Sequence, residues 1–285
     1  MVSIKEKLME ILKGKLDNSI LSELPSRYPM LGEAILLRLK PRSMSYASLI
    51  GNAILNIVSK AKSVWVFVGK TYGVIRRPQI VCVAGDCNPI VTHKELKTTF
   101  RIDISRLTFS PGNSGERARL VEIMDKQDVI VDFFACCGNL SLPIATNKKP
   151  KKIYALEINS LAYSYLLENI RINRVSHIVQ PFLMDNHYWN IFEIADHVLL
   201  GFLPAPDRIQ FELALKTISA EGGIVHYHCV IRKEILTDEI KRLEKLANKA
   251  GYRVIKLEYQ RVKGVAPKLD HFVIRLHVMI KENAC

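Results

Sequence analysis

Two carboxylates and a loop of small residues form the stretch of this chain that could do chemistry. Asp132 directly follows the β-branched run Val129-Ile130-Val131, which is typical of a strand buried on both faces. Residues 135–138 are all small, so the backbone can turn tightly there and approach a ligand before a helix starts. Glu157 ends a second apolar run 25 positions after Asp132, where an acidic residue commonly accepts hydrogen bonds from a ribose. The pattern favours a nucleoside site at two adjacent strand ends.

The same residues also fit an α/β domain that binds no nucleoside. Apolar strands that end in an acid occur in many such domains. Of the dinucleotide-binding pattern G-x-G-x-x-G, this loop contains only one glycine, Gly138. The loop by itself therefore leaves both possibilities open.

Polar and aromatic residues follow the next two predicted strands. Asp185 and Asn186 come after the apolar run of residues 178–182, and a carboxylate there can accept a hydrogen bond from the exocyclic amine of adenine. The loop after the following strand reads Gly201-Phe202-Leu203-Pro204, a stiff segment with an aromatic ring. We expect these four residues to position a substrate. The sequence provides no nucleophile or general base that we can assign.

Ser110 and Arg117 lie where two halves of the chain join. Pro111 disfavours a helix at Ser110, and Asn113 followed by Glu116 resembles a capping box, so a helix should run from residue 114 to about 124. The hydroxyl of Ser110 and the guanidinium of Arg117 could then meet a carboxylate or a ribose near the start of this helix. A capped helix with a surface arginine explains the local pattern equally well.

The elements that must position these residues alternate along the second half of the chain. Hydrophobic periodicity predicts further helices at 140–145, 163–170, 208–218 and 233–250, and strands at 129–131, 153–156, 178–182, 197–202, 223–228, 252–258 and 272–280. Five β-α alternations predict a doubly wound α/β sheet of seven strands. The last strand must insert antiparallel, because no helix separates it from its predecessor.

Two histidines on the strand at 223–228 suggest a catalytic role, since His226 and His228 alternate on one face. Nothing nearby in the sequence orients either ring as a base. A packed or hydrogen-bonded pair in the strand is the better interpretation.

The first half, residues 1–112, is predicted to be a small α+β domain. Helices are expected at residues 4–12 and 46–60, and short strands at 33–39, 64–68, 73–76, 79–83 and 98–104. No nucleophile and base occur together in this half, so we expect it to position the substrate for a catalytic domain at residues 113–285.

A formal charge of +13 is the unusual feature of the composition, with 41 Lys and Arg against 28 Asp and Glu. The basic residues are spread along the chain, which favours a polyanionic partner over a disordered tail. A solvated basic surface is the alternative.

Six cysteines, with no C-x-x-C spacing and no paired histidine cluster, argue against a zinc site. We interpret all six as reduced thiols of a cytoplasmic protein. No apolar run approaches 18 residues, so we expect no membrane span.

Several motifs together resemble the class I S-adenosylmethionine-dependent transferases that modify the guanosine 3′ of the tRNA anticodon. These motifs are Phe109-Ser-Pro, Glu116-Arg, Asp132-Phe-Phe-Ala, Tyr154-Ala-Leu-Glu-Ile-Asn and Glu168-Asn-Ile-Arg-Ile-Asn. The resemblance extends from about residue 25 onward and implies a Rossmann-like catalytic domain. It implies S-adenosylmethionine as the group donor and tRNA as the partner, with no metal. The implied cofactor-binding residues are Ser110, Arg117, Asp132, Phe134, Ala135, Gly138, Glu157, Ile158, Asp185 and Asn186.

Two branches of this family differ in the transferred group. The methyltransferase branch carries an Arg after the Ser-Pro and an Asn-Leu-Pro-Pro-like sequence after the fourth strand, whereas this chain has Gly112 and Gly201. The wybutosine-synthesising aminocarboxypropyltransferase branch carries a small residue after Ser-Pro, Gly-Tyr in the fourth-strand loop and His-Tyr-His on the fifth strand. Ser110-Pro-Gly, Gly201-Phe and His226-Tyr-His resemble that branch. Leu203-Pro204 resembles the methylating branch, and Cys136-Cys137 departs from both.

The resemblance therefore implies transfer of the 3-amino-3-carboxypropyl group to the wyosine-type base beside the anticodon of tRNA(Phe), by a protein that we expect to be a monomer. Methylation of guanine N1 at the same position is the alternative within the family. A basic RNA-binding module without chemistry is the alternative outside it, and it predicts that S-adenosylmethionine does not bind.

Overall fold

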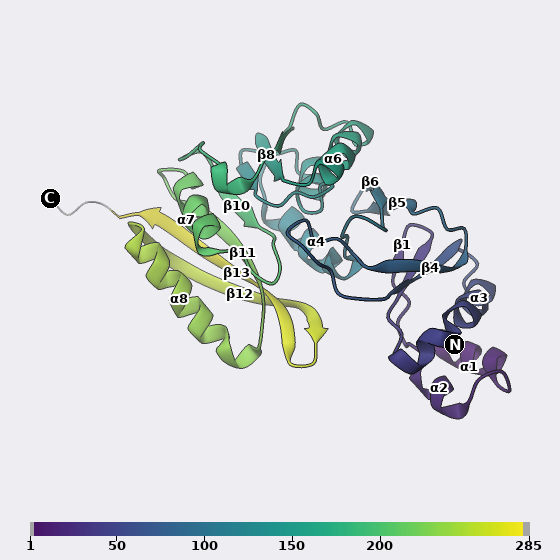
Figure 1. The fold of residues 1–285 in the computed structure, drawn as a ribbon. Coiled ribbons are helices and arrows are strands. Elements are labelled where there is room, and N and C mark those ends of the chain that lie inside the picture. The colour runs from purple at the N-terminus through teal and green to yellow at the C-terminus, as the bar shows by residue number, and fades with distance from the viewer. Residues whose placement is uncertain (1–2, 282–285) are drawn as a thin grey trace. The chain divides into compact units, whose positions relative to one another are not determined.

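The computed structural model describes residues 3–281, and these form two compact units. The first unit comprises the residues up to Lys94 together with Thr99–Pro111, and the second comprises Glu95–Thr98 with the residues from Gly112 onward. Figure 1 shows the elements of both units, each of which is described here by itself.

The first unit packs three helices against a four-stranded sheet. The helices are α1 (Ile4–Leu12), α2 (Asn18–Glu23) and α3 (Ala47–Ile57), and the strands are β1 (Met30–Leu31), β2 (Ala34–Leu37), β3 (Ser63–Phe67) and β4 (Ile80–Gly85), in that spatial order. The apolar stripe of α1 buries Leu8 and Leu12 beside Ile50 and Ile54 of α3, as its helical spacing predicts. β5 (Ile90–Glu95) and β6 (Thr98–Asp103) form a separate two-stranded sheet.

Residues 73–76 form a turn, so the strand predicted there is wrong. An isolated bridge between Tyr72 and Arg77 closes the turn, in which Gly73 and Arg76 have positive φ angles of 71° and 52°. Extended strands require negative φ, and the β-branched Val74 and Ile75 therefore gave a misleading signal.

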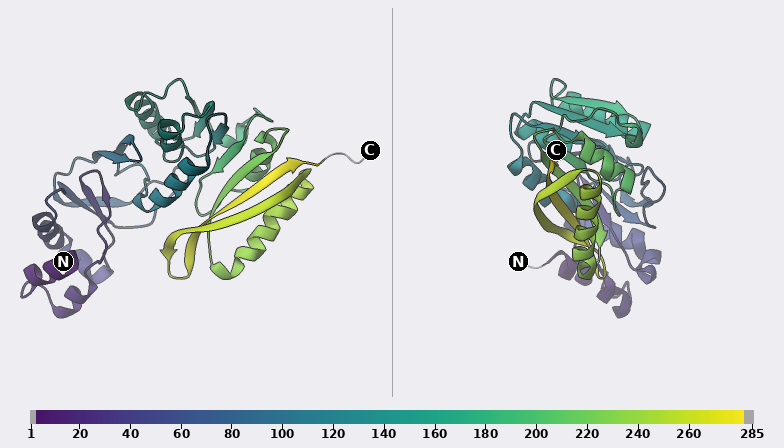
Figure 2. Two further views of the ribbon diagram at one scale, coloured as in Figure 1. Left: turned by 180° about the vertical axis from the view of Figure 1, so that it is seen from behind. Right: turned by 90° about the vertical axis from the view of Figure 1, so that its left-hand side faces the viewer.

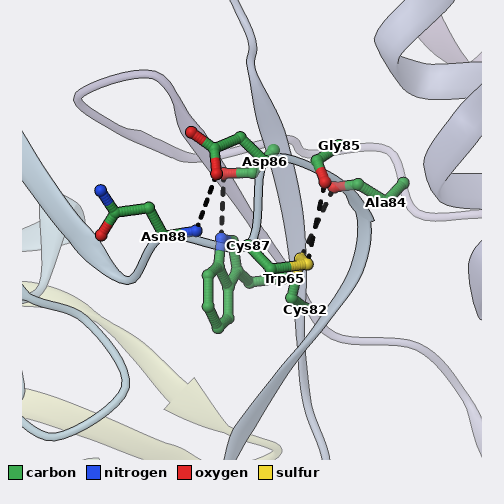
Figure 3. Close-up of a disulfide and its surroundings, with 8 residues drawn as sticks. Trp65, Cys82, Ala84, Gly85, Asp86, Cys87 and Asn88 are labelled. Carbon is green, nitrogen blue, oxygen red and sulfur yellow. Dashed lines mark hydrogen bonds between the residues drawn. A yellow bond between two sulfur atoms is a disulfide. The ribbon is translucent and has the colours of Figure 1, made fainter.

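A disulfide joins Cys82 and Cys87, so the interpretation of every cysteine as a reduced thiol is wrong for these two (Figure 3). β4 ends at Gly85, whose φ of 80° lets the chain reverse and brings the two Cα atoms within 5.5 Å. The side chain of Asp86 accepts a hydrogen bond from the N–H of Asn88 at 3.0 Å in the same turn. Cys136, Cys137 and Cys229 form no disulfide among the described residues, and Cys285 lies outside them.

The second unit is built on a seven-stranded sheet of order β12-β13-β11-β10-β7-β8-β9. Its strands are β7 (Val129–Asp132), β8 (Lys152–Glu157), β9 (Val179–Leu183), β10 (His197–Leu200), β11 (Gly223–Ile231), β12 (Tyr252–Ala266) and β13 (Leu269–Ile280). β7 to β11 pair in parallel, and β13 inserts antiparallel between β12 and β11. The prediction of a doubly wound sheet with an antiparallel last strand is confirmed.

Helix α4 (Ser114–Ile123) precedes β7, and the strands are connected by α5 (Ser141–Asn147), α6 (Ser160–Ile172), α7 (Arg208–Thr217) and α8 (Leu236–Lys249). α5 and α6 pack against β8 and β9, while α8 runs along the hairpin of β12 and β13 (Figure 2). The predicted start of α4 is confirmed, but its capping box is wrong: the side chain of Asn113 makes no cap hydrogen bond. Glu116 instead binds Arg119, one turn further along.

Alternate residues of the central strands form an apolar cluster on one face of the sheet. Val131, Val225 and Tyr227 point to this face and pack against Phe211 of α7 and Leu243 of α8. These strands are buried on both faces, so a slip of one residue would exchange the two faces and move the polar side chains of β11 into this apolar cluster. This core fixes where the strands end.

The opposite face of the same strands carries histidines. His226 of β11 contacts His197 of β10 through ring nitrogens 3.0 Å apart, and His228 contacts His271 of β13 at 3.1 Å. Nε2 of His228 lies 4.0 Å from the carboxylate of Glu116 on α4. These buried rings pair with histidines of neighbouring strands, in agreement with the packed interpretation of the strand.

Burial and the positive charge of Arg119 together lower the pKa of His228 to about 3. The pKa of His271 also falls to about 3, through burial and the nearby His228 and Lys263. Both rings are therefore neutral at pH 7, which avoids a buried positive charge beside Arg119.

This burial predicts that the second unit loses stability in acid. The unfolded chain protonates these histidines below about pH 6.5, but the folded chain resists until about pH 3, so stability is complete above 6.5 and declines through that window. For His228, going from pH 7.5 to 5 should remove about 2 kcal/mol. Urea unfolding at both pH values, followed through Trp189 in a Trp65→Phe background, measures this.

His228→Leu should reduce the pH dependence, whatever its effect on stability at pH 7.5. His177→Gln changes an exposed histidine and should leave the dependence as it is. An equal pH dependence in the His228 variant would contradict the assignment.

Candidate cofactor and substrate site

The predicted site residues of the second unit gather at the carboxyl ends of three adjacent parallel strands. Asp132 ends β7, Glu157 ends β8, and Asp185 follows β9 by two positions. The strand register aligns these ends, because Asp132 pairs with Ala155 and Glu157 pairs with Leu183. In open α/β sheets, ligands bind outside the carboxyl ends of the strands.

Glu157 holds two loops through its two carboxylate oxygens. Oε2 accepts a hydrogen bond from the N–H of Cys136 at 2.7 Å, and Oε1 accepts one from the N–H of Asn159 at 2.7 Å. Burial raises the pKa of Glu157, although these backbone donors oppose the rise. Its side chain is only partly buried, and each oxygen keeps a lone pair that a ribose hydroxyl can use.

The small-residue loop closes as a tight turn between β7 and α5. The N–H of Ala135 donates to the carbonyl of Leu156, and the N–H of Gly138 donates back to Ala135. Gly138 has a φ of 96°, and a Cβ atom there would lie 2.3 Å from the side chain of Leu142. Cys136 also has a positive φ, 52°, which is uncommon for a residue with a side chain.

Asp132 is completely buried at the base of this loop. Burial and the charge of Glu157 raise its pKa to about 7, although hydrogen bonds from Phe134 and Ser141 partly oppose the rise. One carboxylate oxygen accepts the N–H of Phe134 at 3.1 Å. Asp132 therefore helps to order the loop by accepting this backbone hydrogen bond.

Asp185 and Asn186 have different environments at the third strand end. Asp185 is partly exposed, and its Oδ1 accepts the N–H of His187 at 2.9 Å. Asn186 is buried, and its amide donates to the carbonyl of Phe133 at 2.7 Å while its oxygen accepts from Gln210 at 2.9 Å. Asp185 is thus available to a ligand, whereas the Asn186 side chain joins the first strand end to α7.

The loop of residues 201–206 lies beside the small-residue loop. The ring of Phe202 lies 5.1 Å from that of Phe134, centroid to centroid, and a Cβ atom on Gly201 would lie 3.1 Å from Leu140. The N–H of Val230 donates to the carbonyl of Pro204 at 2.7 Å, which anchors the loop to β11. The predicted cofactor residues and the predicted positioning residues are therefore neighbours.

Ser110 and Arg117 are placed differently from the other predicted residues. Arg117 is 1% exposed and donates two hydrogen bonds to the carboxylate of Glu95, at 2.9 and 2.7 Å. Ser110 belongs to the first unit, and the remaining predicted residues belong to the second. The cofactor contacts of Ser110 and Arg117 stay predictions.

Sequence reasoning missed His187, Asp207 and Gln210, which support the site. Asp207 and Gln210 form a capping box at the start of α7, and this D-x-x-Q signature was visible in the sequence. His187 contacts Asp185 and Asp207 through its two ring nitrogens. The contact with Asp207 spans 20 residues, and the sequence offered no signal for it.

The arrangement fits an adenosine-containing cofactor. Glu157 and Asp185 offer carboxylate oxygens to a ribose and to an amine, and Ile158, 44% exposed between them, offers apolar surface to a purine ring. Within residues 3–281, no group of three or more His, Cys, Asp or Glu side chains is arranged to hold a metal ion. The helices in that range are too short or too polar to cross a membrane.

Comparison with known proteins identifies the family. Residues 91–255 match the model described as the TRM5/TYW2 methyltransferase domain, and residues 8–88 match the TYW2 N-terminal domain. The chain belongs to the TRM5/TYW2 family. The predicted resemblance is confirmed, and it includes the first half of the chain.

Two curated relatives represent the two branches. The chain is 30% identical over 276 residues to the tRNA(Phe) (4-demethylwyosine(37)-C(7)) aminocarboxypropyltransferase of Pyrococcus horikoshii, covering 96% of this chain and 97% of that protein. It is 28% identical to the tRNA (guanine(37)-N(1))-methyltransferase Trm5b of Pyrococcus abyssi, covering 90% of this chain and 76% of that protein.

Two solved structures of family members contain relevant ligands. TYW2 of P. horikoshii in complex with MeSAdo is 28% identical, with a TM-score of 0.79, over 96% of this chain and 99% of that chain. The complex of aTrm5 with tRNALeu is 27% identical, with a TM-score of 0.81, over 97% of this chain and 79% of that chain. The prediction of a Rossmann-like transferase fold is confirmed.

The geometry of the small-residue loop predicts that one substitution weakens cofactor binding and that a second one leaves it nearly unchanged. Gly138→Ala adds a methyl group at a positive φ and against Leu142, so it should cost about 1–3 kcal/mol of stability and weaken S-adenosylmethionine binding at least tenfold. Cys136→Gly relieves a positive φ in the same turn and should leave the affinity within about twofold. Calorimetric titration and thermal unfolding of both variants measure these effects. Normal binding by Gly138→Ala would contradict the loop's role.

Proposed function

We propose that this protein transfers the 3-amino-3-carboxypropyl group of S-adenosylmethionine to the tricyclic wyosine-type base 3′ of the anticodon in tRNA. The observation that carries the proposal is the placing of the Glu157 and Asp185 carboxylates at neighbouring strand ends, beside a loop with a glycine at position 201. The aminocarboxypropyltransferase of P. horikoshii, which aligns along nearly its whole length, supports the same reaction.

The chain's contribution to this reaction is orientation. The sulfonium cofactor supplies three electrophilic carbons, and the one that faces the nucleophile decides which group is transferred. Glu157 would hold the ribose and Asp185 the adenine, which fixes the adenosine at the ends of β8 and β9. Phe202, packed on Phe134, would present an aromatic surface to the unstacked base of an anticodon loop.

Gly201 favours this branch over methylation. A Cβ atom there would approach Leu140 to 3.1 Å, so the larger residue of the methylating relatives would require Leu140 to move. The glycine leaves room for the methionine arm beside the base. Glycine also lacks the polar side chain that the methylating branch carries at this position. Methylation at a guanine nitrogen would use such a group for charge stabilisation.

We expect the label of the transferred group to identify the reaction. The protein is incubated with tRNA(Phe) carrying 4-demethylwyosine and with S-adenosylmethionine labelled either in the methyl carbon or in the carboxyl carbon. Carboxyl label in tRNA and release of methylthioadenosine support the proposal. Methyl label in tRNA with S-adenosylhomocysteine released assigns the chain to the methylating branch, and no cofactor binding at all assigns it to a non-catalytic RNA-binding role.

Glu157→Gln should weaken S-adenosylmethionine binding. The amide keeps one acceptor oxygen for the loops but loses the charge, and a hydrogen bond to a charged group contributes about 1.5–3 kcal/mol, so affinity should fall roughly tenfold or more. Glu221→Gln, the same change in an exposed turn before β11, is the matched control. Equal affinities of the two variants, measured by calorimetry, would remove Glu157 from the site.

tRNA binding should depend strongly on salt. Basic residues distributed over both units would contact phosphates and release counterions, so tRNA affinity should fall by about tenfold or more between 50 and 200 mM salt. Filter binding with the full chain measures the slope, and S-adenosylmethionine affinity under the same conditions is the control. A flat response would contradict an electrostatic contribution of the two units to tRNA binding.

A further inference from the structure

His187 bridges two carboxylates that belong to different parts of the second unit. Its Nδ1 lies 2.7 Å from Oδ1 of Asp185, and its Nε2 lies 2.7 Å from Oδ2 of Asp207. Asp185 precedes a short 3-10 turn, Asn186–Tyr188, and its Oδ1 also accepts the backbone N–H of His187. Both ring nitrogens are thus engaged, and the carboxylate of Asp185 is held by two donors from one residue.

The other end of the bridge is anchored to the helix that follows the substrate loop. Oδ1 of Asp207 caps α7 by accepting the N–H of Gln210 at 2.9 Å, which leaves Oδ2 for His187. A parallel connection runs from Asn186 to the side chain of Gln210 at 2.9 Å. The segment after β9 is therefore fixed to the start of α7 at two adjacent points.

We propose that His187 is a positioning residue that holds the Asp185 carboxylate in the orientation in which it accepts a hydrogen bond from the exocyclic amine of the cofactor's adenine. Through Asp207 it fixes that orientation relative to α7 and the loop of residues 201–206. This inference rests on the proposed function, because it concerns how the same site selects an adenine.

Charge explains why histidine suits this position. Burial lowers the pKa of His187, but its bonds to Asp207 and Asp185 and their negative charges outweigh burial and raise it above 6.5. The pKa of Asp185 falls, since these bonds and charges outweigh its own burial. The protonated ring donates to both carboxylates at once, whereas a neutral ring has only one N–H. The bridge should therefore be complete below the pKa of His187 and incomplete above it.

The test compares two unreactive ligands that differ at the purine edge that Asp185 would bind. S-adenosylhomocysteine carries the exocyclic amine beside an unprotonated N1, and S-inosylhomocysteine carries a carbonyl oxygen beside an N1–H. The wild-type protein should bind the adenosyl ligand at least about tenfold more tightly, because a carboxylate held toward the amine repels the oxygen. The ratio of the two dissociation constants, measured by calorimetry, reports the orientation of Asp185.

Two variants break the bridge at different atoms. His187→Gln cannot donate to both carboxylates, and Asp207→Asn keeps a good N-cap for α7 while losing the charge that binds His187. Both should reduce the ratio by about threefold or more, as expected for one weakened charge-assisted bond. His177→Gln, the same substitution at an exposed position before β9, should leave the ratio unchanged.

The pH dependence of this ratio is a second measurement, and a purely structural role of His187 would not affect it. In the wild-type protein the ratio should decrease as the pH rises past the pKa of His187, and in His187→Gln it should be independent of pH. If both ligands weaken equally in the variants, so that the ratio stays at the wild-type value, His187 supports the fold and the inference is overturned. If the wild-type protein binds neither ligand, the proposed function itself is overturned.

Discussion

The site depends on one carboxylate that accepts backbone hydrogen bonds from two loops. Glu157 stands at the end of β8, and its two oxygens hold the N–H groups of Cys136 and Asn159. Such bonds are charge-assisted and partly shielded from water, so they fix the loops firmly. The remaining lone pairs are the ones that the proposed ribose contact would use. A structural contact and a proposed ligand contact therefore share the same two atoms.

The two faces of the sheet explain why these strand ends lie where they do. The apolar face, packed against α7 and α8, fixes the register of the strands and so the level at which Asp132 and Glu157 emerge. The opposite face is polar near β11 and β13, where neutral histidines meet Glu116 and Arg119. Buried polar groups of this kind stabilise a fold only while they are correctly protonated. The position of the strand ends therefore depends on the packing of one face of the sheet and on the neutral histidines of the other.

Local patterns in the sequence predicted most of the fold and the strand-end residues. Apolar runs ending at Asp132 and Glu157 carried their own signal, and the missing helix before residues 269–280 predicted the antiparallel insertion of β13. Predictions failed where specific side-chain partners and backbone turns decide, because apolar periodicity does not report them. Glu116 binds Arg119 and does not complete a capping box with Asn113, and the Cys82–Cys87 disulfide depends on the turn at Gly85. The bridge of His187 to Asp207 joins residues that no local pattern connects.

The most direct test of this account is a crystal structure of the protein with methylthioadenosine bound. The account predicts ribose hydroxyls within hydrogen-bond distance of Glu157, the adenine amine at Asp185, and the methylthio group directed toward the loop of residues 201–204. An adenosine bound away from the ends of β8 and β9, or one whose ribose makes no contact with Glu157, would contradict it.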